Sequence, residues 1–192
     1  AETEGGSLDP GALPLLLDRQ SQATAVLAGP GMDKDRSTEL LVQQLVSNIE
    51  KPLLLDADAL RTRVVEVVRN RREHFGSVVV TPHMGEFMRI AKLGEPDYSS
   101  ETLKKFSQKF KLITVLKGPN TRISDGETVS YHTHGGPVLA RGGSGDLLAG
   151  LIGGMMAQKE VPAIEAVSRG LMMHGLGAQY LARERGQVAV RT

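Results

Sequence analysis

Short apolar runs alternate with longer segments of helical periodicity along most of this chain. Strands are expected at four apolar runs, residues 24–28, 53–55, 77–80 and 112–116. Helices are expected where apolar residues recur at helical spacing, at residues 12–20, 35–49, 58–72, 85–93 and 101–110. Alternating strands and helices build a parallel sheet, and strands that are apolar throughout have both faces covered. The alternation therefore predicts an α/β domain with a mostly parallel central sheet and helices on both faces.

The second half of the chain departs from this alternation. Asp125-Gly126 separates two strand-like runs, 121–124 and 128–132, and this dipeptide between two strands is a strong hairpin signal. The hairpin is expected to add antiparallel strands at one edge of the sheet. Two further helices are predicted at 145–158 and 162–183.

Composition excludes several classes of function. Lys and Arg number 23 against 22 Asp and Glu, so neither nucleic acid nor an acidic membrane is an expected partner. The densest basic run, Arg69 to Arg72, is interpreted as a solvated helix end. The absence of Cys excludes disulfides, Cys-based zinc sites and thiol catalysis. No apolar run reaches the roughly 18 residues of a membrane span, and we predict a cytoplasmic protein.

Each predicted strand ends in glycine or in polar residues. The four ends are Gly29-Pro30-Gly31, Asp56 with Asp58, Thr81-Pro82-His83, and Lys117-Gly118. Ligands of open α/β sheets bind outside the carboxyl ends of the strands. We therefore expect these four ends to line one rim that forms a binding site.

A glycine-rich turn, Gly142-Gly143-Ser144-Gly145-Asp146, leads directly into an apolar helix. The start of a helix exposes backbone N–H groups with partial positive charge, and glycine lets a phosphate approach them closely. Phosphoryl transfer needs such an anion site and a carboxylate that takes a proton from a hydroxyl. The turn offers both, with Asp146 as the candidate base; its structural alternative is a helix-capping acid.

Five segments carry a family resemblance in addition to these patterns. They are Ala28 to Met32, Pro52 to Leu60 (PLLLDADAL), Val80 to Ile90 (VTPHMGEFMRI), Val115 to Thr121 (VLKGPNT) and Gly135 to Gln158, with His174-Gly175 downstream. In their order and spacing, they resemble the ADP/ATP-dependent NAD(P)H-hydrate dehydratase family, a carbohydrate-kinase-like branch of the ribokinase-like superfamily. The turn alone points only to the superfamily.

The resemblance implies a repair reaction. ADP or ATP, with Mg²⁺, phosphorylates the hydroxyl that water added to the nicotinamide ring, and loss of phosphate restores NADH or NADPH. The implied catalytic residue is Asp146, which also contacts the substrate. The implied nucleotide-binding residues are Lys117, Gly118, Pro119, Asn120, Thr121, Gly136, Arg141, Gly142, Gly143, Ser144 and Gly145. The implied contacts to the hydrated cofactor are Gly31, His83, Gly85, Glu86 and Arg89. The resemblance also implies a homo-oligomer, tetrameric or larger, and a preference for ADP over ATP.

Most of these residues also have a purely structural interpretation. His83 is alternatively a loop histidine, Glu86 a residue of a first helical turn, and Lys117 a solvated strand end. Asp56 and Asp58 are alternatively turn-forming and helix-capping acids. His174 is interpreted as a packed core histidine.

Two of the departures from the family bear most on function and on the completeness of the domain. Arg141 stands where the family usually has Thr, with an open effect on nucleotide preference. Family domains also begin with additional strands, so residues 1–192 are interpreted as a single domain that is incomplete at its N-terminus. An incomplete sheet exposes an apolar edge, which we expect other residues or a partner subunit to cover.

Two other functions stay open at this point. One is an ATP-dependent kinase of a small alcohol such as hydroxyethylthiazole, because the turn and Asp146 suit it equally. The other is a non-catalytic nucleotide-binding fragment. The residues show no cluster typical of a metal site, and the metal stays undetermined.

Overall fold

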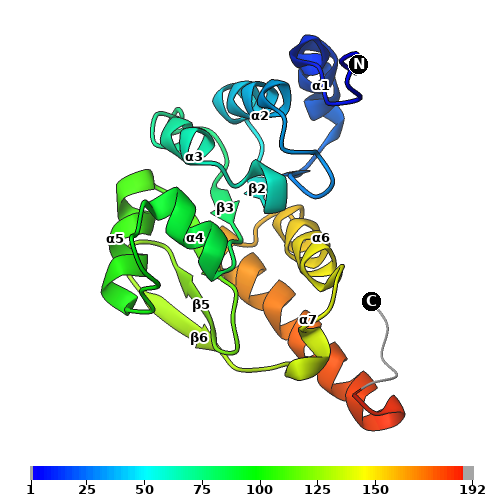
Figure 1. The fold of residues 1–192 in the computed structure, drawn as a ribbon, viewed down its shortest axis with the longest axis vertical. Helices are drawn as coiled ribbons and strands as arrows, with labels where there is room; N and C mark the ends of the chain where they lie inside the picture. Colours follow the sequence, from blue (N-terminus) through cyan, green and yellow to red (C-terminus); the bar gives the residue numbers. More distant parts are fainter. Residues whose placement is uncertain (1, 188–192) are drawn as a thin grey trace.

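The computed structural model describes residues 2–187, which form a single six-stranded sheet packed between helices (Figure 1). Residues 1 and 188–192 of the predicted domain lie outside the described residues. The strands are β1 (Val26–Ala28), β2 (Leu53–Leu55), β3 (Val78–Val80), β4 (Ile113–Leu116), β5 (Thr121–Ser124) and β6 (Val129–His132). The helices are α1 (Leu13–Arg19), α2 (Arg36–Asn48), α3 (Thr62–Val68), α4 (Met84–Ala91), α5 (Ser100–Phe110), α6 (Ser144–Met156) and α7 (Ala163–Arg185). Short 3-10 helices are η1 (Pro10–Ala12), η2 (Gln20–Gln22), η3 (Ala57–Ala59) and η4 (Pro137–Leu139).

The strands lie in chain order, β1-β2-β3-β4-β5-β6. Strands β1 to β4 are parallel to one another, and β5 and β6 continue the sheet as an antiparallel hairpin. The mostly parallel sheet and the hairpin at its edge are both confirmed. Because four parallel strands follow one another without a break, their carboxyl ends form one continuous rim.

Two cores lie on opposite faces of the sheet, as the alternation of side chains in a strand requires. Leu53 and Leu55 of β2 pack with helices α2 to α5, whereas Leu54 between them packs with α6 and α7. All three side chains are fully buried. The prediction of helices on both faces is therefore confirmed, and the apolar runs of the sequence correspond to strands covered twice.

The predicted helix 58–72 is wrong at both ends. After β2 the chain turns tightly through η3, where Ala57 has a left-handed φ of 47°, and α3 starts only at Thr62. Asp58 caps no α-helix; its Oδ2 accepts the backbone N–H of Asp33 at 3.2 Å. At the other end the Arg71 guanidinium donates to the carbonyls of Val46, Ile49 and Gly76 at 2.6, 2.7 and 2.9 Å.

Arg71 therefore corrects the interpretation of residues 69–72 as a solvated helix end. Its guanidinium is half-buried, and this burial lowers its pKa. A single side chain thus satisfies three backbone carbonyls. Arg71 joins the chain after α3 to the end of α2 and to the loop before β3, so its role is structural.

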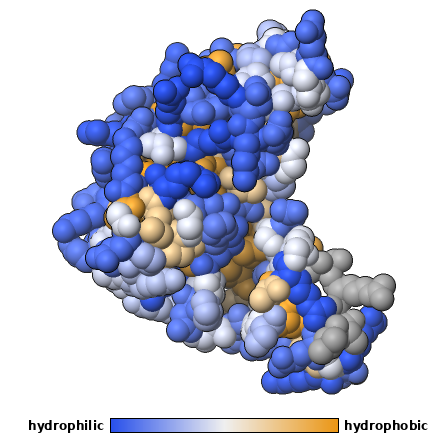
Figure 2. Space-filling view, in the orientation of Figure 1, coloured by the Kyte–Doolittle hydropathy of each residue, from blue (hydrophilic) through white to orange (hydrophobic). Residues whose placement is uncertain are grey.

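The edge of the sheet formed by β1, opposite the hairpin, is apolar and has no neighbouring strand among the described residues. Strand β1 is the terminal strand, and Leu27 on it is 39% exposed. On the face shown in Figure 2, hydrophobic residues gather in a hollowed centre, while the outer parts are mostly hydrophilic. The exposure of Leu27 on the terminal strand agrees with the expected apolar edge. None of the described helices is long and apolar enough to cross a membrane.

Candidate active site

The polar strand ends assemble into the predicted rim. The backbone N–H of Asp56, after β2, donates to the carbonyl of Ala28 at the end of β1 (3.1 Å). The backbone N–H of Lys117, after β4, donates to the carbonyl of Pro82 (2.8 Å), and His83 forms a parallel bridge with Lys117. Parallel pairing thus extends beyond β2, β3 and β4 and holds Asp56, His83 and Lys117 on regular backbone.

Lys117 and Asp56 form an ion pair directly beneath the glycine-rich turn. Lys117 Nζ lies 2.8 Å from Asp56 Oδ1, with side-chain exposures of 21% and 2%. A Cβ added to Gly145 would lie 3.6 Å from Lys117 Nζ and 4.0 Å from Asp56 Oδ2. The ends of β2 and β4 therefore meet the start of α6 at one point. The interpretation of Lys117 as a solvated strand end is wrong, and Asp56 provides no side-chain cap for η3.

The start of α6 has the properties expected of an anion site. Its N-cap, Gly143, adopts a left-handed conformation (φ 81°) that favours glycine, and no side chain caps the helix there. The first N–H groups of a helix lack partners within the helix and carry partial positive charge. Lys117 adds a cation below this helix start. Asp146 follows in the first turn with an exposed carboxylate, in a position open to a ligand.

His83 and Glu86 form a capping box at the start of α4. His83 Nδ1 accepts the backbone N–H groups of Gly85 and Glu86 at 3.1 and 3.4 Å, and Glu86 Oε2 accepts that of His83 at 2.8 Å. Because Nδ1 is an acceptor, a neutral His83 carries its proton on Nε2. Glu86 is buried, which confirms its interpretation as a residue of the first helical turn. The His83 side chain is 61% exposed, and its other nitrogen, Nε2, lies 3.5 Å from Glu86 Oε1.

The loop between β4 and β5 is closed by a hydrogen bond from Thr121, the first residue of β5. Thr121 Oγ1 donates to the carbonyl of Gly118 at 3.1 Å, while Gly118, Pro119 and Asn120 are exposed. Its backbone is therefore ordered yet accessible, as a nucleotide-binding loop requires.

The remaining predicted residues lie around this centre. Gly31 (φ 68°) turns the chain after β1, and Gly136 (φ 139°) precedes η4; both conformations favour glycine. Arg89 donates to the carbonyl of Leu60 at 3.4 Å. Arg141 donates to the carbonyl of Gln187 beyond α7, so its guanidinium bridges the turn to the end of that helix.

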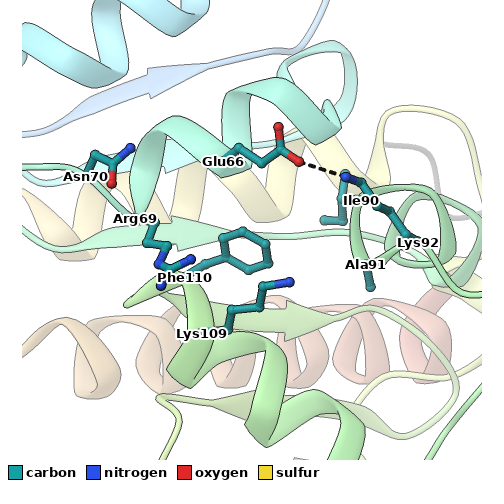
Figure 3. A pocket seen from close by; sticks show the side chains of 8 residues that line it. All are labelled: Glu66, Arg69, Asn70, Ile90, Ala91, Lys92, Lys109 and Phe110. Carbon is teal, nitrogen blue, oxygen red and sulfur yellow. Dashed lines mark hydrogen bonds and ion pairs between the residues drawn. The ribbon is translucent and has the colours of Figure 1, made fainter.

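A hollow of about 310 Å³ lies elsewhere, between α3, α4 and α5 (Figure 3). These helices begin near the rim and run towards the amino ends of the strands. The hollow lies near the last turns of the helices. Its lining residues are Glu66, Arg69, Asn70, Ile90, Ala91, Lys92, Lys109 and Phe110. None of the predicted site residues is among them.

A sheet of this order, with a glycine-rich helix start above its carboxyl rim, defines a ribokinase-like α/β protein. The NAD(P)H-hydrate dehydratase family profile matches residues 8–192. The chain belongs to this family.

Individual relatives agree with this assignment. The chain is 35% identical over 196 residues to the "Bifunctional NAD(P)H-hydrate repair enzyme Nnr" of Moorella thermoacetica, covering 98% of this chain and 36% of the relative. It is 30% identical to the "ADP-dependent (S)-NAD(P)H-hydrate dehydratase" of Nitrosopumilus maritimus, covering 92% of this chain and 58% of the relative. The chain thus spans only part of the length of these curated relatives.

A solved structure shares the fold. The ADP/ATP-dependent NAD(P)H-hydrate dehydratase of Bacillus subtilis, co-crystallised with ATP/Mg²⁺ and soaked with CoA, superposes with a TM-score of 0.76 at 27% identity. The match covers 95% of this chain and 72% of that one. The ribokinase-like fold predicted from the sequence is confirmed.

Proposed function

We propose that this chain forms the catalytic α/β part of a nucleotide-dependent NAD(P)H-hydrate dehydratase. The observation that carries the proposal is the Lys117–Asp56 pair beneath Gly145, in the turn that also bears the exposed Asp146. An anion site and an accessible carboxylate within one helical turn suit phosphoryl transfer to a hydroxyl. The names of the relatives support the hydrated cofactor as the substrate and ADP, more than ATP, as the donor.

The proposed reaction has two steps. The ring hydroxyl of hydrated NADH or NADPH attacks the terminal phosphorus of the nucleotide, Asp146 takes the hydroxyl proton, and the bond to the rest of the nucleotide breaks. The ring then loses the new phosphate together with a proton from the neighbouring carbon, which restores the double bond. Asp146 serves the first step because its carboxylate is exposed beside the anion site.

We assign the two ligands to the two halves of the rim. The nucleotide contacts Lys117 to Thr121, Gly136 and Arg141 to Gly145, where backbone N–H groups and cations are concentrated. The hydrated cofactor contacts Gly31, His83, Gly85 and Arg89, and the contribution of Glu86 is indirect. His83 meets this ligand with its exposed ring, whereas the buried Glu86 acts by holding the backbone of His83.

Mg²⁺ fits this site only as part of a nucleotide complex. Within residues 2–187 there is no group of three or more potential ligands that could hold a metal alone. Mg²⁺ is usually held by substrate phosphates, waters and one or two carboxylates, and Asp56 and Asp146 lie at the rim. The ion would neutralise charge on the transferred phosphoryl group.

The open edge at β1 bears on the assembly. We propose that further chain of the same protein, or another subunit of a homo-oligomer, covers Leu27 and the neighbouring apolar surface in a cytoplasmic enzyme. The exposed strand edge supports this, because an uncovered apolar edge promotes aggregation.

Recovery of the near-ultraviolet absorbance of NADH from its hydrate tests the proposal. The protein containing this chain should restore the absorbance with ADP or ATP and Mg²⁺, and not without nucleotide. ATP-dependent phosphorylation of hydroxyethylthiazole without hydrate repair would select the kinase alternative. Nucleotide binding without turnover of either substrate would select the non-catalytic alternative.

A further inference from the structure

Ser144 differs from the rest of the glycine-rich turn because its side chain points inward. The residue is 4% exposed, whereas Gly142, Gly143 and Asp146 are exposed. Its Oγ lies 3.3 Å from Nε2 of His174 on α7, a residue 9% exposed. A buried hydrogen bond therefore joins the first residue of α6 to the middle of α7.

The position of His174 is set by close backbone packing on both sides. A Cβ at Gly170, one helical turn earlier, would lie 2.8 Å from Ile152 Cγ1 of α6. A Cβ at Gly175 would lie 2.7 Å from His134 Cβ. Helix α7 is thus held against α6 and against the loop before η4, so the imidazole has little freedom to follow Ser144.

The hydrogen bond acts without a charge at neutral pH. Burial lowers the pKa of His174 and outweighs the hydrogen bonding to Ser144, which raises it. A neutral ring adds no cation behind the anion site, so any effect on a bound phosphate must come from geometry.

We propose that His174 is a positioning residue for the anion site. Through Ser144 it fixes the first residue of α6, and so the directions of the next N–H groups and of the Asp146 carboxylate. The phosphate of the nucleotide is the ligand class concerned, and in this respect the inference rests on the proposed function. A histidine that merely fills the core would affect stability without affecting phosphate binding.

Four variants separate these roles. His174→Leu removes the hydrogen bond, His174→Gln keeps a side-chain donor and acceptor, and Ser144→Ala removes the other partner. Val167→Ala, in the same helix and fully buried in the core beneath the sheet, is the matched control for lost stability. ADP affinity is measured by calorimetry, and hydrogen exchange is measured at the amides of Ser144 and Leu147, which donate to the carbonyls of Arg141 and Gly143 at 3.3 and 3.0 Å.

We expect His174→Leu to weaken ADP binding about tenfold, the factor that corresponds to one hydrogen bond. Exchange at Ser144 and Leu147 should accelerate more than in Val167→Ala, and His174→Gln should restore part of both properties. Ser144→Ala combined with His174→Leu should weaken ADP binding no more than the worse single variant, because the two residues share one interaction.

Equal ADP affinity and equal exchange in His174→Leu and Val167→Ala would overturn the inference. If the unmodified protein binds no ADP, the proposed function fails instead. The exchange rates then decide whether His174 positions the turn, since they need no ligand.

Discussion

Two lysine–carboxylate pairs lie at opposite ends of the same sheet with the same separation. Lys117 Nζ to Asp56 Oδ1 at the rim and Lys92 Nζ to Glu66 Oε1 beside the hollow of Figure 3 both measure 2.8 Å. The rim pair is 21% and 2% exposed, whereas the other pair is 68% and 50% exposed. The two ion pairs therefore have the same separation but very different exposure to water.

The surroundings decide what each pair can do. Water and salt screen the exposed pair, although Lys92 still lowers the pKa of Glu66 by hydrogen bonding and charge. The rim pair lies in a poorly hydrated place, where each charge depends on its partner and acts strongly on a ligand. The ion pair beside the hollow is thus expected to matter less than the pair at the rim, and four predictions test this difference.

The largest effect is expected from Asp146→Asn. Turnover of hydrated NADH should fall by about two to four orders of magnitude because the proton acceptor is lost, whereas ADP affinity should change little. Glu66→Gln at the opposite end is the control and should leave turnover unchanged. If Asp146→Asn retains most of the activity, Asp146 is only an acid of the first helical turn.

Lys117→Met should cause the largest loss of stability. It leaves the Asp56 carboxylate buried without its partner, which costs about 3 kcal/mol of unfolding free energy in urea titration. Lys117→Met with Asp56→Asn should recover much of that loss, since no unpaired charge stays buried. A change in Lys117→Met too small to measure would show that water reaches Asp56 freely.

Gly145→Ala should separate folding from binding. Its Cβ would be in ordinary contact with Lys117 Nζ at 3.6 Å, and alanine favours the helix by up to about 1 kcal/mol. The methyl group occupies the approach of a phosphate, so ADP affinity should fall about tenfold, or 1.4 kcal/mol. Gly150→Ala, whose Cβ would have no neighbour within 4 Å, should stabilise α6 without affecting ADP affinity. Unchanged ADP affinity in Gly145→Ala would show that the phosphate does not bind beside Gly145.

The smallest effect is expected from Lys92→Met. The exposed pair should contribute no measurable stability at moderate salt, so the urea midpoint should stay that of the unmodified protein. A loss as large as that of Lys117→Met would mean that burial does not distinguish the two ends.

The site was only partly predictable from the sequence. The glycine-rich turn and the four polar strand ends were visible, and so was the acid at the start of α4. The capping box was also accessible in principle, because Glu86 follows His83 by three residues, the spacing of such a box. Asp56 was noted as a strand end, but its pairing with Lys117 was missed. Two opposite charges at the ends of apolar strands were the available signal.

Local periodicity determined the order of strands and helices, the parallel sheet and the hairpin, because strand and helix repeats depend on neighbours in sequence. Periodicity did not predict the bounds of α3. The turn at Ala57 delays the start of the helix, and the hydrogen bonds of Arg71 to backbone carbonyls end it earlier than its apolar pattern does. Tertiary structure alone decided which side chains meet. Asp56 and Lys117 are 61 residues apart, and Ser144 and His174 are 30 apart. Such pairs follow from strand order and helix packing, which bring distant residues together and remove them from water.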